Sequence, residues 1–530
     1  MWKGVIIVMK RFNLTGVCVP DKHYMVDLSE KVDIIIKDYI EQGAYFTVNR
    51  ARQFGKTTML SSLARRLADK YLVIKLSFEG IDDGNFNDNH SFVDMFVKNV
   101  TKWLRQMNVE QEIINEWMDK HYDESTVTGK AFDILGDKIT RLCNSAKKGV
   151  ILLVDEVDKS SNNQIFLNFL GLLRSKYLDM QEGLDTSFQS VILARVYNVK
   201  NLKLKLRPEA ERKYNSPWNI AADFDVDMSF SVDEIAKMLK QYSADTGISM
   251  DTHAVSEKIR FYTNGYPFLV SWLCKWIDER GGRQWTIQNV ENAEKELLNN
   301  DNMLFDDMIQ NIENNKELKQ IIIGVLIEGK KLLCAKSDLV INMGMMFGIL
   351  AEKEKMVSIS NIIFETYLYN HMIVEKMRKQ YTFAYENNQF IKNGELDMER
   401  ALQKFQEVMK AEYRNEDVSF IERQGRLLFL CFMKPIINGK GNYYVEPETR
   451  DNTRMDVVIS YGGCEYIVEL KIWRGQQYRQ RGLAQLEEYL DSRNNQKGYL
   501  ISFSFNKDKM YVQNTMIFEN SQKEVYEIIV

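Results

Sequence analysis

The sequence predicts an α/β protein of several domains, and two observations carry that prediction. Four apolar runs rich in β-branched residues alternate with helical stretches between residues 44 and 230, which is typical of strands buried on both faces of a parallel sheet. A second alternation of helices and strands begins near residue 411. The 530 residues provide room for three or four domains.

The pattern along the chain divides it into five segments. Residues 231–299 repeat apolar side chains at helical spacing, and residues 300–372 lead through helices to a strand at 355–359, as a winged helix does. The core strands are expected at 45–48, 71–76, 150–154 and 191–194. The expected segments are an α/β core (1–230), a helical lid (231–299), a winged helix (300–372), a helical linker (373–410) and a second α/β domain (411–530).

The composition excludes several classes of protein. Lys and Arg number 70 against 74 Asp and Glu, so the net charge of −4 excludes a globally basic nucleic-acid coat but not a local basic groove. No run approaches the ~20 apolar residues of a membrane span, so no membrane partner is expected. The six cysteines include no Cys-x-x-Cys pair, which argues against disulfides or a zinc ribbon and favours a reducing, cytoplasmic location.

The first expected strand runs into a loop that ends in Gly55-Lys56-Thr57 and opens a helix. Backbone N–H groups and the helix N-terminus can meet phosphate oxygens there, Lys56 can reach the β- and γ-phosphates, and the Thr57 hydroxyl can bind Mg²⁺. Arg50 replaces the first glycine of the usual Gly-x-x-x-x-Gly-Lys-Thr motif. The expected nucleotide-binding residues of the loop are Arg50, Arg52, Gln53, Phe54, Gly55, Lys56, Thr57 and Thr58.

A second motif closes the apolar strand 150–154 with Asp155 and Glu156. In P-loop ATPases an aspartate at this point joins the magnesium shell, and the glutamate polarises the attacking water. The alternative is a strand end with solvated charges. Because the pair follows a Gly-Lys-Thr loop in the expected order, we expect ATP and Mg²⁺ to bind, with Thr57 and Asp155 as metal ligands and Glu156 as a catalytic residue.

With these motifs, residues from about 10 to 300 resemble the bacterial AAA-ATPase-like group, allied to archaeal-type and STAND-like P-loop ATPases. In that group an Arg-rich loop ending in Phe-Gly-Lys-Ser/Thr replaces the first glycine, and Arg50 and Arg52 match it. The resemblance implies a lid whose Gly-x-Pro turn lies near the adenine, which places Pro267 at the nucleotide; an ordinary turn between helices is the alternative. The resemblance is also compatible with homo-oligomers formed through the ATPase domain.

A third motif lies near the C-terminus, where Asp456 opens one expected strand and Glu469 and Lys471 lie on the next, after a Gly462-Gly463 turn. Adjacent strands joined by a tight turn would place Asp456 beside Glu469, with Lys471 on the same face. Two carboxylates can hold Mg²⁺, which lowers the pKa of a bound water, while an ammonium stabilises the charge that develops in phosphodiester cleavage. The alternative is a hairpin with solvated, alternating charges.

Two flanking helices extend this motif. Glu422 offers a further metal-shell acid, and Gln485 and Tyr489 share one helix face. The order Glu, Asp, Glu-x-Lys, Gln-x-x-x-Tyr resembles the RecB-like branch of the PD-(D/E)XK nucleases over about 411–515, although Met455 stands where the family usually has Pro. The resemblance implies a restriction-endonuclease-like domain with catalytic Asp456, Glu469, Lys471, Gln485 and Tyr489 and metal ligands Glu422, Asp456 and Glu469.

The sequence therefore predicts an ATP-hydrolysing protein coupled to a Mg²⁺-dependent nuclease that acts on nucleic acid, with DNA favoured, in defence against mobile DNA or in DNA processing. Near the nuclease motif, Lys471, Arg474, Arg479 and Arg481 suit a phosphate track, with a solvated run of charges as the alternative. The main rival is a nucleotide-operated switch or scaffold whose C-terminal domain binds nucleic acid without cleaving it. A regulator that reads sequence through the winged helix is less favoured, because residues 339–346 are uncharged.

Overall fold

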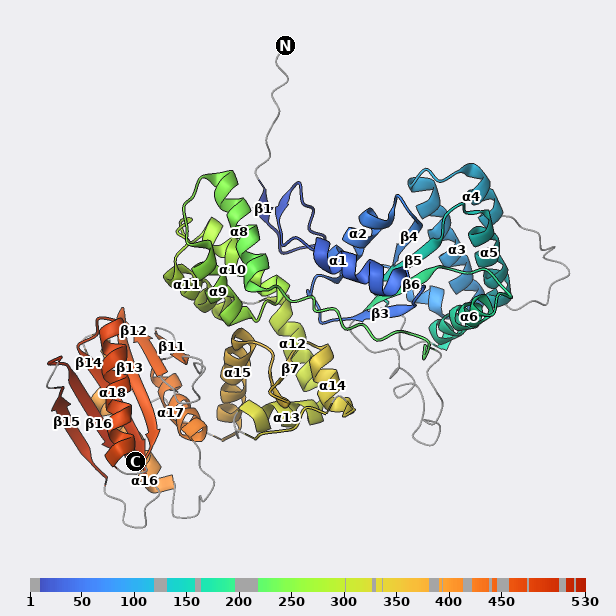
Figure 1. The fold of residues 1–530 in the computed structure, drawn as a ribbon. Coiled ribbons are helices and arrows are strands. Elements are labelled where there is room, and N and C mark those ends of the chain that lie inside the picture. The colour runs from blue at the N-terminus through green and yellow to red at the C-terminus, as the bar shows by residue number, and fades with distance from the viewer. Residues whose placement is uncertain are drawn as a thin grey trace. The chain divides into compact units, whose positions relative to one another are not determined.

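The computed structural model (Figure 1) divides the chain into two compact units. Unit 1 comprises Met1–Asn314 and Ala335–Ala351, and unit 2 comprises Asn315–Cys334 and Glu352–Val530, so the chain crosses between the units three times. The structure describes residues 10–118, 131–157, 164–195, 218–300, 302–326, 330–335, 337–380, 390–392, 394–412, 422–437, 441–445, 457–473, 476–504, 511–518 and 521–530.

Unit 1 is built on a parallel sheet with the strand order β3-β6-β5-β4. These strands confirm the four predicted ones, with ends that differ by one residue at most. They span Phe46–Asn49 (β3), Leu72–Ser77 (β4), Val150–Asp155 (β5) and Ser190–Arg195 (β6). The chain passes from β3 through helix α2 (Lys56–Leu67) to β4, which is the kind of helical crossover that parallel strands require.

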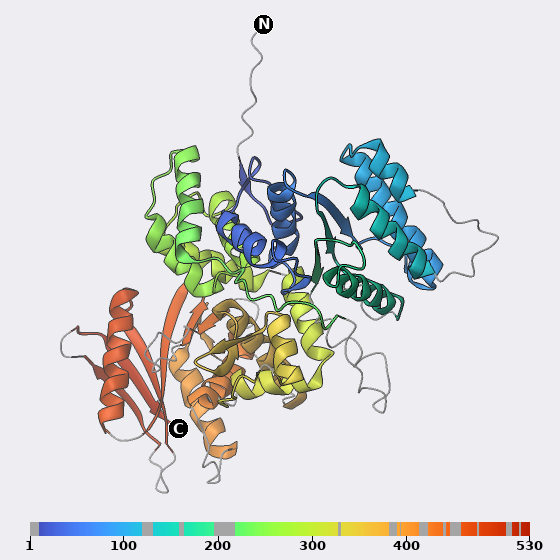
Figure 2. The same cartoon turned by 45° about the vertical axis from the view of Figure 1, so that its right-hand side comes forward.

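Both faces of this sheet are covered by helices, which explains the continuous apolar sequence of its strands (Figure 2). In β5, Leu152 and Val154 pack into a core formed with α3–α6, whereas Ile151 and Leu153 pack into a second core formed with α1 and α2. The helices span Ser29–Ile35 (α1, continued by a π-helix over Ile36–Ile40), Asn89–Gln106 (α3, after a 3₁₀ turn at Asp83–Phe86), Gln111–Met118 (α4), Ala131–Ser145 (α5) and Gln164–Gln181 (α6).

Four helices follow the core strands in the segment predicted to be the lid, and they are called the lid below. Ser231 starts the first of them through a capping box with Glu234, and Gly247 ends it at a φ of 72°. A short parallel ribbon of β1 (Arg11–Phe12) and β2 (His23–Tyr24) packs its aromatic rings against Tyr242 and Trp285 of the lid. The lid helices are Val232–Thr246 (α8), Thr252–Thr263 (α9), Pro267–Glu279 (α10) and Ile287–Asn299 (α11), and Met303–Glu313 (α12) and Leu339–Met346 (α14) complete unit 1.

Residues 300–372, predicted as a winged helix, contain the border between the two units. Besides α12 and α14 they form Lys316–Leu326 (α13), Leu350–Lys353 (β7), Met356–Ile359 (β8) and the start of Ile362–Gln380 (α15). The predicted strand at 355–359 and the helix after it are therefore confirmed. Because α12 and α14 pack in unit 1 whereas α13, β8 and α15 belong to unit 2, this segment links the units.

Unit 2 is built on a mixed sheet with the strand order β11-β12-β13-β14-β16-β15, in which β13, β14 and β16 are parallel and the other pairs antiparallel. Helix α18 (Gln476–Ser492) covers one face through Leu486 and Leu490. On the other face, Phe405 of α16 (Met398–Glu412) packs against Phe503 and against Phe429 of α17 (Glu422–Ile437). The strands are Gly441–Val445 (β11), Val457–Tyr461 (β12), Cys464–Ile472 (β13), Lys497–Phe503 (β14), Gln513–Ile517 (β15) and Glu524–Ile529 (β16).

The segment 373–410 differs from the predicted helical linker. It includes a hairpin of β9 (Ile391–Lys392) and β10 (Glu395–Leu396) and most of α16. Helix α16 buries Leu402 and Phe405, and its Gln406 side chain donates a hydrogen bond to the carbonyl oxygen of Ile529. The segment is part of the unit 2 fold because the apolar stripe of α16 needs the sheet to cover it.

No helix among the described residues combines the length and the apolar composition needed to cross a bilayer.

The buried carboxyl group of Glu294 in α11 provides a test of how the four helices of residues 231–299 pack. Burial raises its pKa from 4.5 to about 7. Because the pKa is higher in the folded chain than in the unfolded chain, the penalty for ionising Glu294 is absent below about pH 4.5 and complete above about pH 7. Glu294→Gln should therefore raise the free energy of unfolding, relative to wild type, by about 3 kcal/mol more at pH 8 than at pH 4.

Denaturant unfolding at the two pH values measures this difference. Glu257→Gln is the control, because Glu257 lies on a lid helix with its side chain 61% exposed. Equal pH dependence in the two variants would contradict the prediction.

Candidate functional site

The carboxyl ends of β3 and β5 lie at one edge of the unit 1 sheet, because the strands are parallel. Such an edge is where open α/β sheets bind ligands. Gln53, Gly55 and Glu156 adopt left-handed backbone conformations there, with φ values of 55°, 80° and 54°. For a residue with a side chain this conformation costs about 1–3 kcal/mol, and such strain is found preferentially at active sites and ligand clamps.

Lys56 occupies the start of α2 with its side chain buried. Its ammonium donates hydrogen bonds to the carbonyl oxygens of Arg50 (3.0 Å) and Ala51 (2.8 Å), so the loop wraps around a cation. Gly55 precedes it and supplies no side-chain cap to the helix. The positive end of the α2 dipole and the lysine charge thus lie together, which favours binding of a phosphate group.

Thr57, Thr58, Asp155 and Glu156 lie on the elements that meet at this edge. The Thr58 hydroxyl accepts a hydrogen bond from the backbone N–H of Cys18 at 3.2 Å. Asp155 ends β5 with a buried side chain, and its Oδ1 accepts from the N–H of Glu156 at 3.0 Å. Thr57 and Asp155 offer the hydroxyl and carboxylate oxygens that Mg²⁺ prefers. The described residues contain no group of three or more His, Cys, Asp or Glu placed to hold a metal, so phosphate and water would have to complete this shell.

Lys75 of β4 was not expected at this site. Its Nζ donates to Ser61 Oγ at 2.5 Å, and that hydroxyl donates to the Thr57 carbonyl at 2.8 Å. Burial lowers the pKa of Lys75, while the charge of Asp155 acts in the opposite direction. This second cation links the P-loop helix to the strands behind it; a lysine within an apolar strand was the one signal in the sequence.

Arg50, predicted to bind nucleotide, is held by protein groups. Its guanidinium donates to the carbonyl oxygens of Asn49 and Val226, each at 2.8 Å, and lies 5.3 Å from the ring centre of Phe224. Burial lowers its pKa, with Asp227 and Asp225 acting in the opposite direction. Arg50 thus fastens the start of the loop to the segment that leads into the lid.

Arg52 and Phe54 contact the lid turn that the sequence singled out. The Tyr266 hydroxyl donates to the carbonyl oxygen of Arg52, and the rings of Phe54 and Tyr266 meet edge to face at 4.7 Å. Pro267 is buried as the first residue of α10. Gly265 is required before it, because a Cβ there would lie 2.2 Å from the carbonyl oxygen of Phe230. The turn therefore packs against the P-loop. The side-chain oxygen of Gln53 is buried without a hydrogen-bond partner among the described residues.

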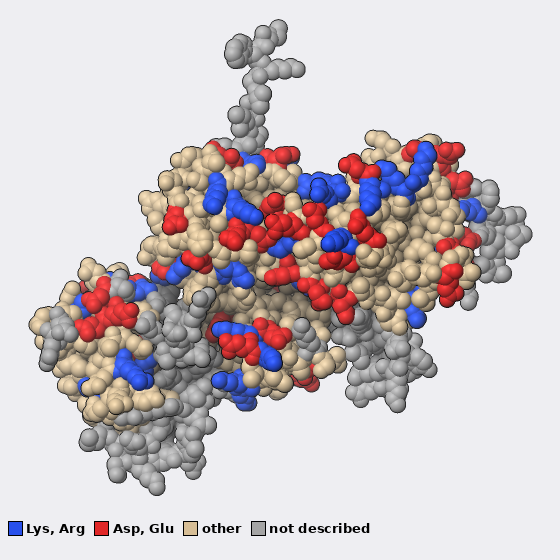
Figure 3. Space-filling view, viewed as in Figure 1, with Lys and Arg blue, Asp and Glu red and all other residues tan. Residues whose placement is uncertain are grey.

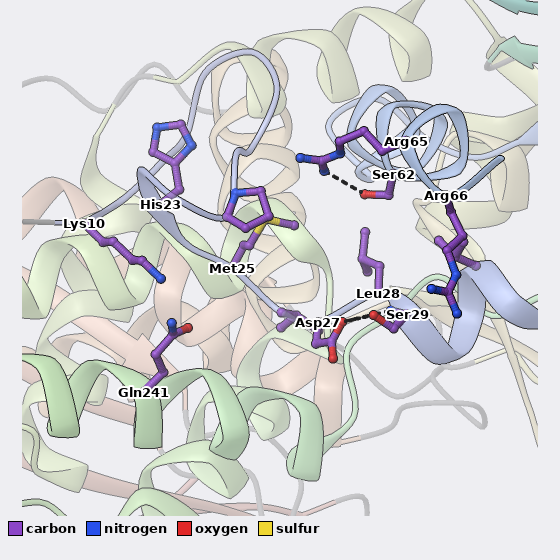
Figure 4. Close-up of a pocket in the computed structure, with 13 residues that line it drawn as sticks. Lys10, His23, Met25, Asp27, Leu28, Ser29, Ser62, Arg65, Arg66 and Gln241 are labelled. Carbon is purple, nitrogen blue, oxygen red and sulfur yellow. Dashed lines mark hydrogen bonds between the residues drawn. The ribbon is translucent and has the colours of Figure 1, made fainter. Parts of the chain in front are cut away.

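A pocket of about 590 Å³ opens beside α2 (Figure 4). Lys10 and Gln241 of α8 lie on one side of it, and Ser62 and Arg65 of α2 lie on the other. The Nδ1 atom of His23 accepts a hydrogen bond from the backbone N–H of Val19 at 2.9 Å, and burial lowers the histidine pKa. The volume of the pocket lies in the range of small-molecule sites.

In unit 2 the predicted hairpin is confirmed: Tyr461 pairs with Cys464 across the Gly462-Gly463 turn. Glu469 and Lys471 are both buried on β13, with 2.7 Å between Oε1 and Nζ. Apart from this ion pair, neither carboxylate oxygen of Glu469 has a hydrogen-bond partner among the described residues. The buried side-chain oxygen of Gln485 on α18 is likewise unpaired in the described part of the chain. Buried acceptors of this kind are rare and need an explanation.

Three further residues were predicted to belong to the nuclease site: Glu422, Asp456 and Tyr489. Asp456 lies outside the described residues, and of Glu422 only the backbone at the start of α17 is described. Tyr489 lies on α18 and packs against the apolar cluster between this helix and the sheet. Asp456 and Glu422 therefore stay predictions from the sequence.

Arg479, one of the residues predicted to contact phosphates, is instead paired within unit 2. The Arg479 guanidinium forms a bidentate pair with the buried Glu527 carboxylate of β16, with contacts of 2.6–3.0 Å, and this pairing raises the pKa of Arg479. Arg481 is exposed with its guanidinium 5.7 Å from the ring of Tyr478, and Arg474 lies outside the described residues. On the face drawn in Figure 3, basic and acidic side chains are interspersed.

The position of Arg50 leads to a prediction about stability. Arg50→Met should lower the free energy of unfolding by about 1–3 kcal/mol, because it leaves two partly buried carbonyl oxygens without their charged donor. Arg52→Met is the matched control and should change it by about 1 kcal/mol at most, since the Arg52 side chain is 60% exposed. Denaturant unfolding of both variants measures this, and equal destabilisation would contradict the assigned role of Arg50.

Comparison with known proteins places this geometry in a family. A family model described as an AAA-like domain matches residues 17–370. No match was found among curated proteins. The Walker-type ATPase PABY2304 of Pyrococcus abyssi is 11% identical with a TM-score of 0.43, over 67% of this chain and 99% of that one.

Two Aeropyrum pernix structures are also similar. The ORC2 protein in its ADPNP–ADP complexes is 11% identical (TM-score 0.36, 66% of this chain, 95% of that one). The ORC1 protein in complex with DNA is 12% identical (TM-score 0.27, 66% and 93%). These likenesses are too distant to indicate function by themselves. The family match covers more than half of the chain, including the P-loop, Asp155 and the lid, and the chain therefore belongs to the AAA-like domain family, with an ATPase-type core in unit 1.

Proposed function

We propose that the chain binds and hydrolyses ATP with Mg²⁺ at the P-loop edge of unit 1 and thereby controls a Mg²⁺-dependent nuclease in unit 2. The observation that carries the first half is the convergence of the Gly55–Thr57 loop and the Asp155–Glu156 strand end at one edge of a parallel sheet. Defence against mobile DNA or DNA processing is the biological role that this pairing suits.

Each residue at that edge has a distinct role in this proposal. Lys56 exchanges the loop carbonyl oxygens for the β- and γ-phosphate oxygens, and the backbone N–H groups of the loop hold the phosphates in place. Thr57 and Asp155 would hold Mg²⁺, which neutralises charge on the phosphates. Glu156 orients the attacking water, and its left-handed backbone turns it away from the path of β5.

The pocket beside α2 suits the nucleoside part of the ligand. Ser62, which lines it, follows Lys56 by six residues and so lies roughly 9 Å farther along the helix axis. That separation is comparable with the distance between the phosphates and the base of a nucleotide. The lid lines the same pocket through Gln241, so a bound base would connect the core with the lid.

Two substitutions separate nucleotide binding from hydrolysis. Lys56→Ala should abolish ATP binding, because it removes the charge that faces the phosphates, whereas Glu156→Gln should keep binding and slow hydrolysis by about 10²-fold or more. Titration calorimetry and a phosphate-release assay measure the two effects. Lys37→Ala, which changes an exposed lysine, is the control. Equal loss of ATP affinity in both variants would refute the roles assigned here.

The nuclease half of the proposal is supported by unit 2. Its elements follow the order helix α17, antiparallel strands β11–β13, helix α18 and parallel strand β14. Glu469 brings buried, incompletely paired oxygens, and Lys471 brings an ammonium 2.7 Å away. Val457, which follows Asp456 in the sequence, pairs with Val468, which precedes Glu469.

These residues would share the work of phosphodiester cleavage. Glu469, with Asp456, would hold Mg²⁺, which activates water for attack on the phosphodiester. Lys471 stabilises the negative charge that develops on the phosphate, and Gln485 orients the water or the scissile group. DNA is the favoured substrate.

Variants of the second site test this half. Asp456→Ala or Glu469→Gln should lower metal-dependent cleavage of DNA by about 10²-fold or more, and Lys471→Ala should lower the rate with less effect on metal binding. Glu465→Gln, on the same strand, should cleave like wild type. ATP hydrolysis should be unchanged in all of these variants, because the hydrolytic residues lie in unit 1.

Two outcomes would contradict the nuclease proposal. Cleavage at the wild-type rate by the double variant of Asp456 and Glu469 would place the site elsewhere. A wild-type chain that binds nucleic acid but never cuts it with any nucleotide or metal would favour the switch or scaffold.

A further inference from the structure

The P-loop is held by two segments that lie beyond the lid in the sequence. The Arg52 guanidinium contacts the Asp307 carboxylate of α12 at 2.6 Å, from Nη1 to Oδ2. Gly348 lies so close to the loop that a Cβ on it would come within 2.6 Å of the Ala51 Cβ. Both contacts lie within unit 1.

These segments adjoin the points where the chain leaves unit 1. Helix α12 ends at Glu313, directly before the crossing from Asn314 to Asn315. Gly348 lies three residues before the crossing from Ala351 to Glu352. The phosphate-binding loop is therefore in contact with both segments through which the chain passes into unit 2.

In the Arg52–Asp307 pair, a phosphate group could replace the Asp307 carboxylate as the partner of Arg52. Arg52 belongs to the loop that is proposed to surround the phosphates, and its side chain is 60% exposed, against 23% for Asp307. A pair in water-accessible surroundings is worth little, whereas a guanidinium gains more from a multiply charged phosphate. The carboxylate and the phosphate compete for the same N–H donors, because a guanidinium has a fixed, planar set of them.

We infer that Asp307 is a nucleotide-sensing residue: it holds Arg52 in the nucleotide-free chain, and a nucleoside triphosphate takes Arg52 away from it. The exchange frees α12, the helix that ends directly before the chain enters unit 2, and so transmits nucleotide binding at the loop to the second unit. The inference rests on the proposed nucleotide binding at the P-loop and adds a positioning residue that does not touch the phosphates itself.

The affinity for ATPγS with Mg²⁺ tests the competition. Asp307→Asn should bind ATPγS more tightly than wild type, by up to about fivefold, because Arg52 no longer has to leave a carboxylate. The difference should shrink as the salt concentration rises. Asp306→Asn is the matched control: it removes the same charge from the neighbouring, exposed position of α12 and should bind like wild type.

A double-mutant cycle guards against an indirect effect of Asp307→Asn on folding. In an Arg52→Gln background, Asp307→Asn should bring no gain in affinity, since the residue for which Asp307 competes is absent. Equal affinities of Asp307→Asn and Asp306→Asn, or weaker binding by Asp307→Asn, would overturn the inference.

Hydrogen exchange of the full chain tests the transmission. Saturating ATPγS should increase exchange in the first turns of α12 in wild type, and Asp307→Asn should show that increase without nucleotide. Unchanged exchange in α12 despite measured ATPγS binding would overturn the inference and leave the proposed function intact. A wild-type chain that fails to bind ATPγS would overturn both.

Discussion

A parallel sheet covered on both faces is the constraint on which unit 1 depends. Because successive residues of β5 pack into opposite cores, the strand carries apolar side chains until its last residue, and its first charge is Asp155. The same parallel arrangement brings the loop after β3 to that edge. The burial of Lys56 at the helix start is possible because loop carbonyl oxygens accept hydrogen bonds from its ammonium group.

Unit 2 contains two buried carboxylates, Glu469 and Glu527, whose hydrogen-bond partners differ. Glu469 and Glu527 lie in register across Leu500 of β14, so they occupy one face of the sheet. Glu527 is satisfied by a bidentate arginine, which fastens α18 to β16. Glu469 has one ammonium contact and oxygens without hydrogen bonds in the described chain. An incompletely paired buried carboxylate is costly, which favours a ligand as its missing partner.

The two arginines of the P-loop show how burial separates similar side chains. Both match the Arg-rich loop, yet Arg50 is half-buried, with its guanidinium bonded to the carbonyl oxygen of Val226 and close to the ring of Phe224. Arg52 is largely exposed and is paired with the Asp307 carboxylate, which we propose a nucleotide replaces. Sequence spacing places both residues in the loop, but the direction of each side chain depends on contacts with residues 176 and 255 positions away.

The local features of the fold were predictable from the sequence alone. β-Branched runs specified the strands of the core, Gly55-Lys56-Thr57 specified a helix start suited to phosphate, and Gly462-Gly463 specified the hairpin, because these features depend on neighbours in the chain. Three contacts could be found only in the tertiary structure. They are the Arg479–Glu527 pair, the hydrogen bond from Lys75 to the P-loop helix, and the contact of Asp307 with the P-loop. Each contact joins residues that are distant in the sequence. The residues next to a charged side chain do not show whether it is paired in the fold or faces solvent, so the sequence could not predict these contacts.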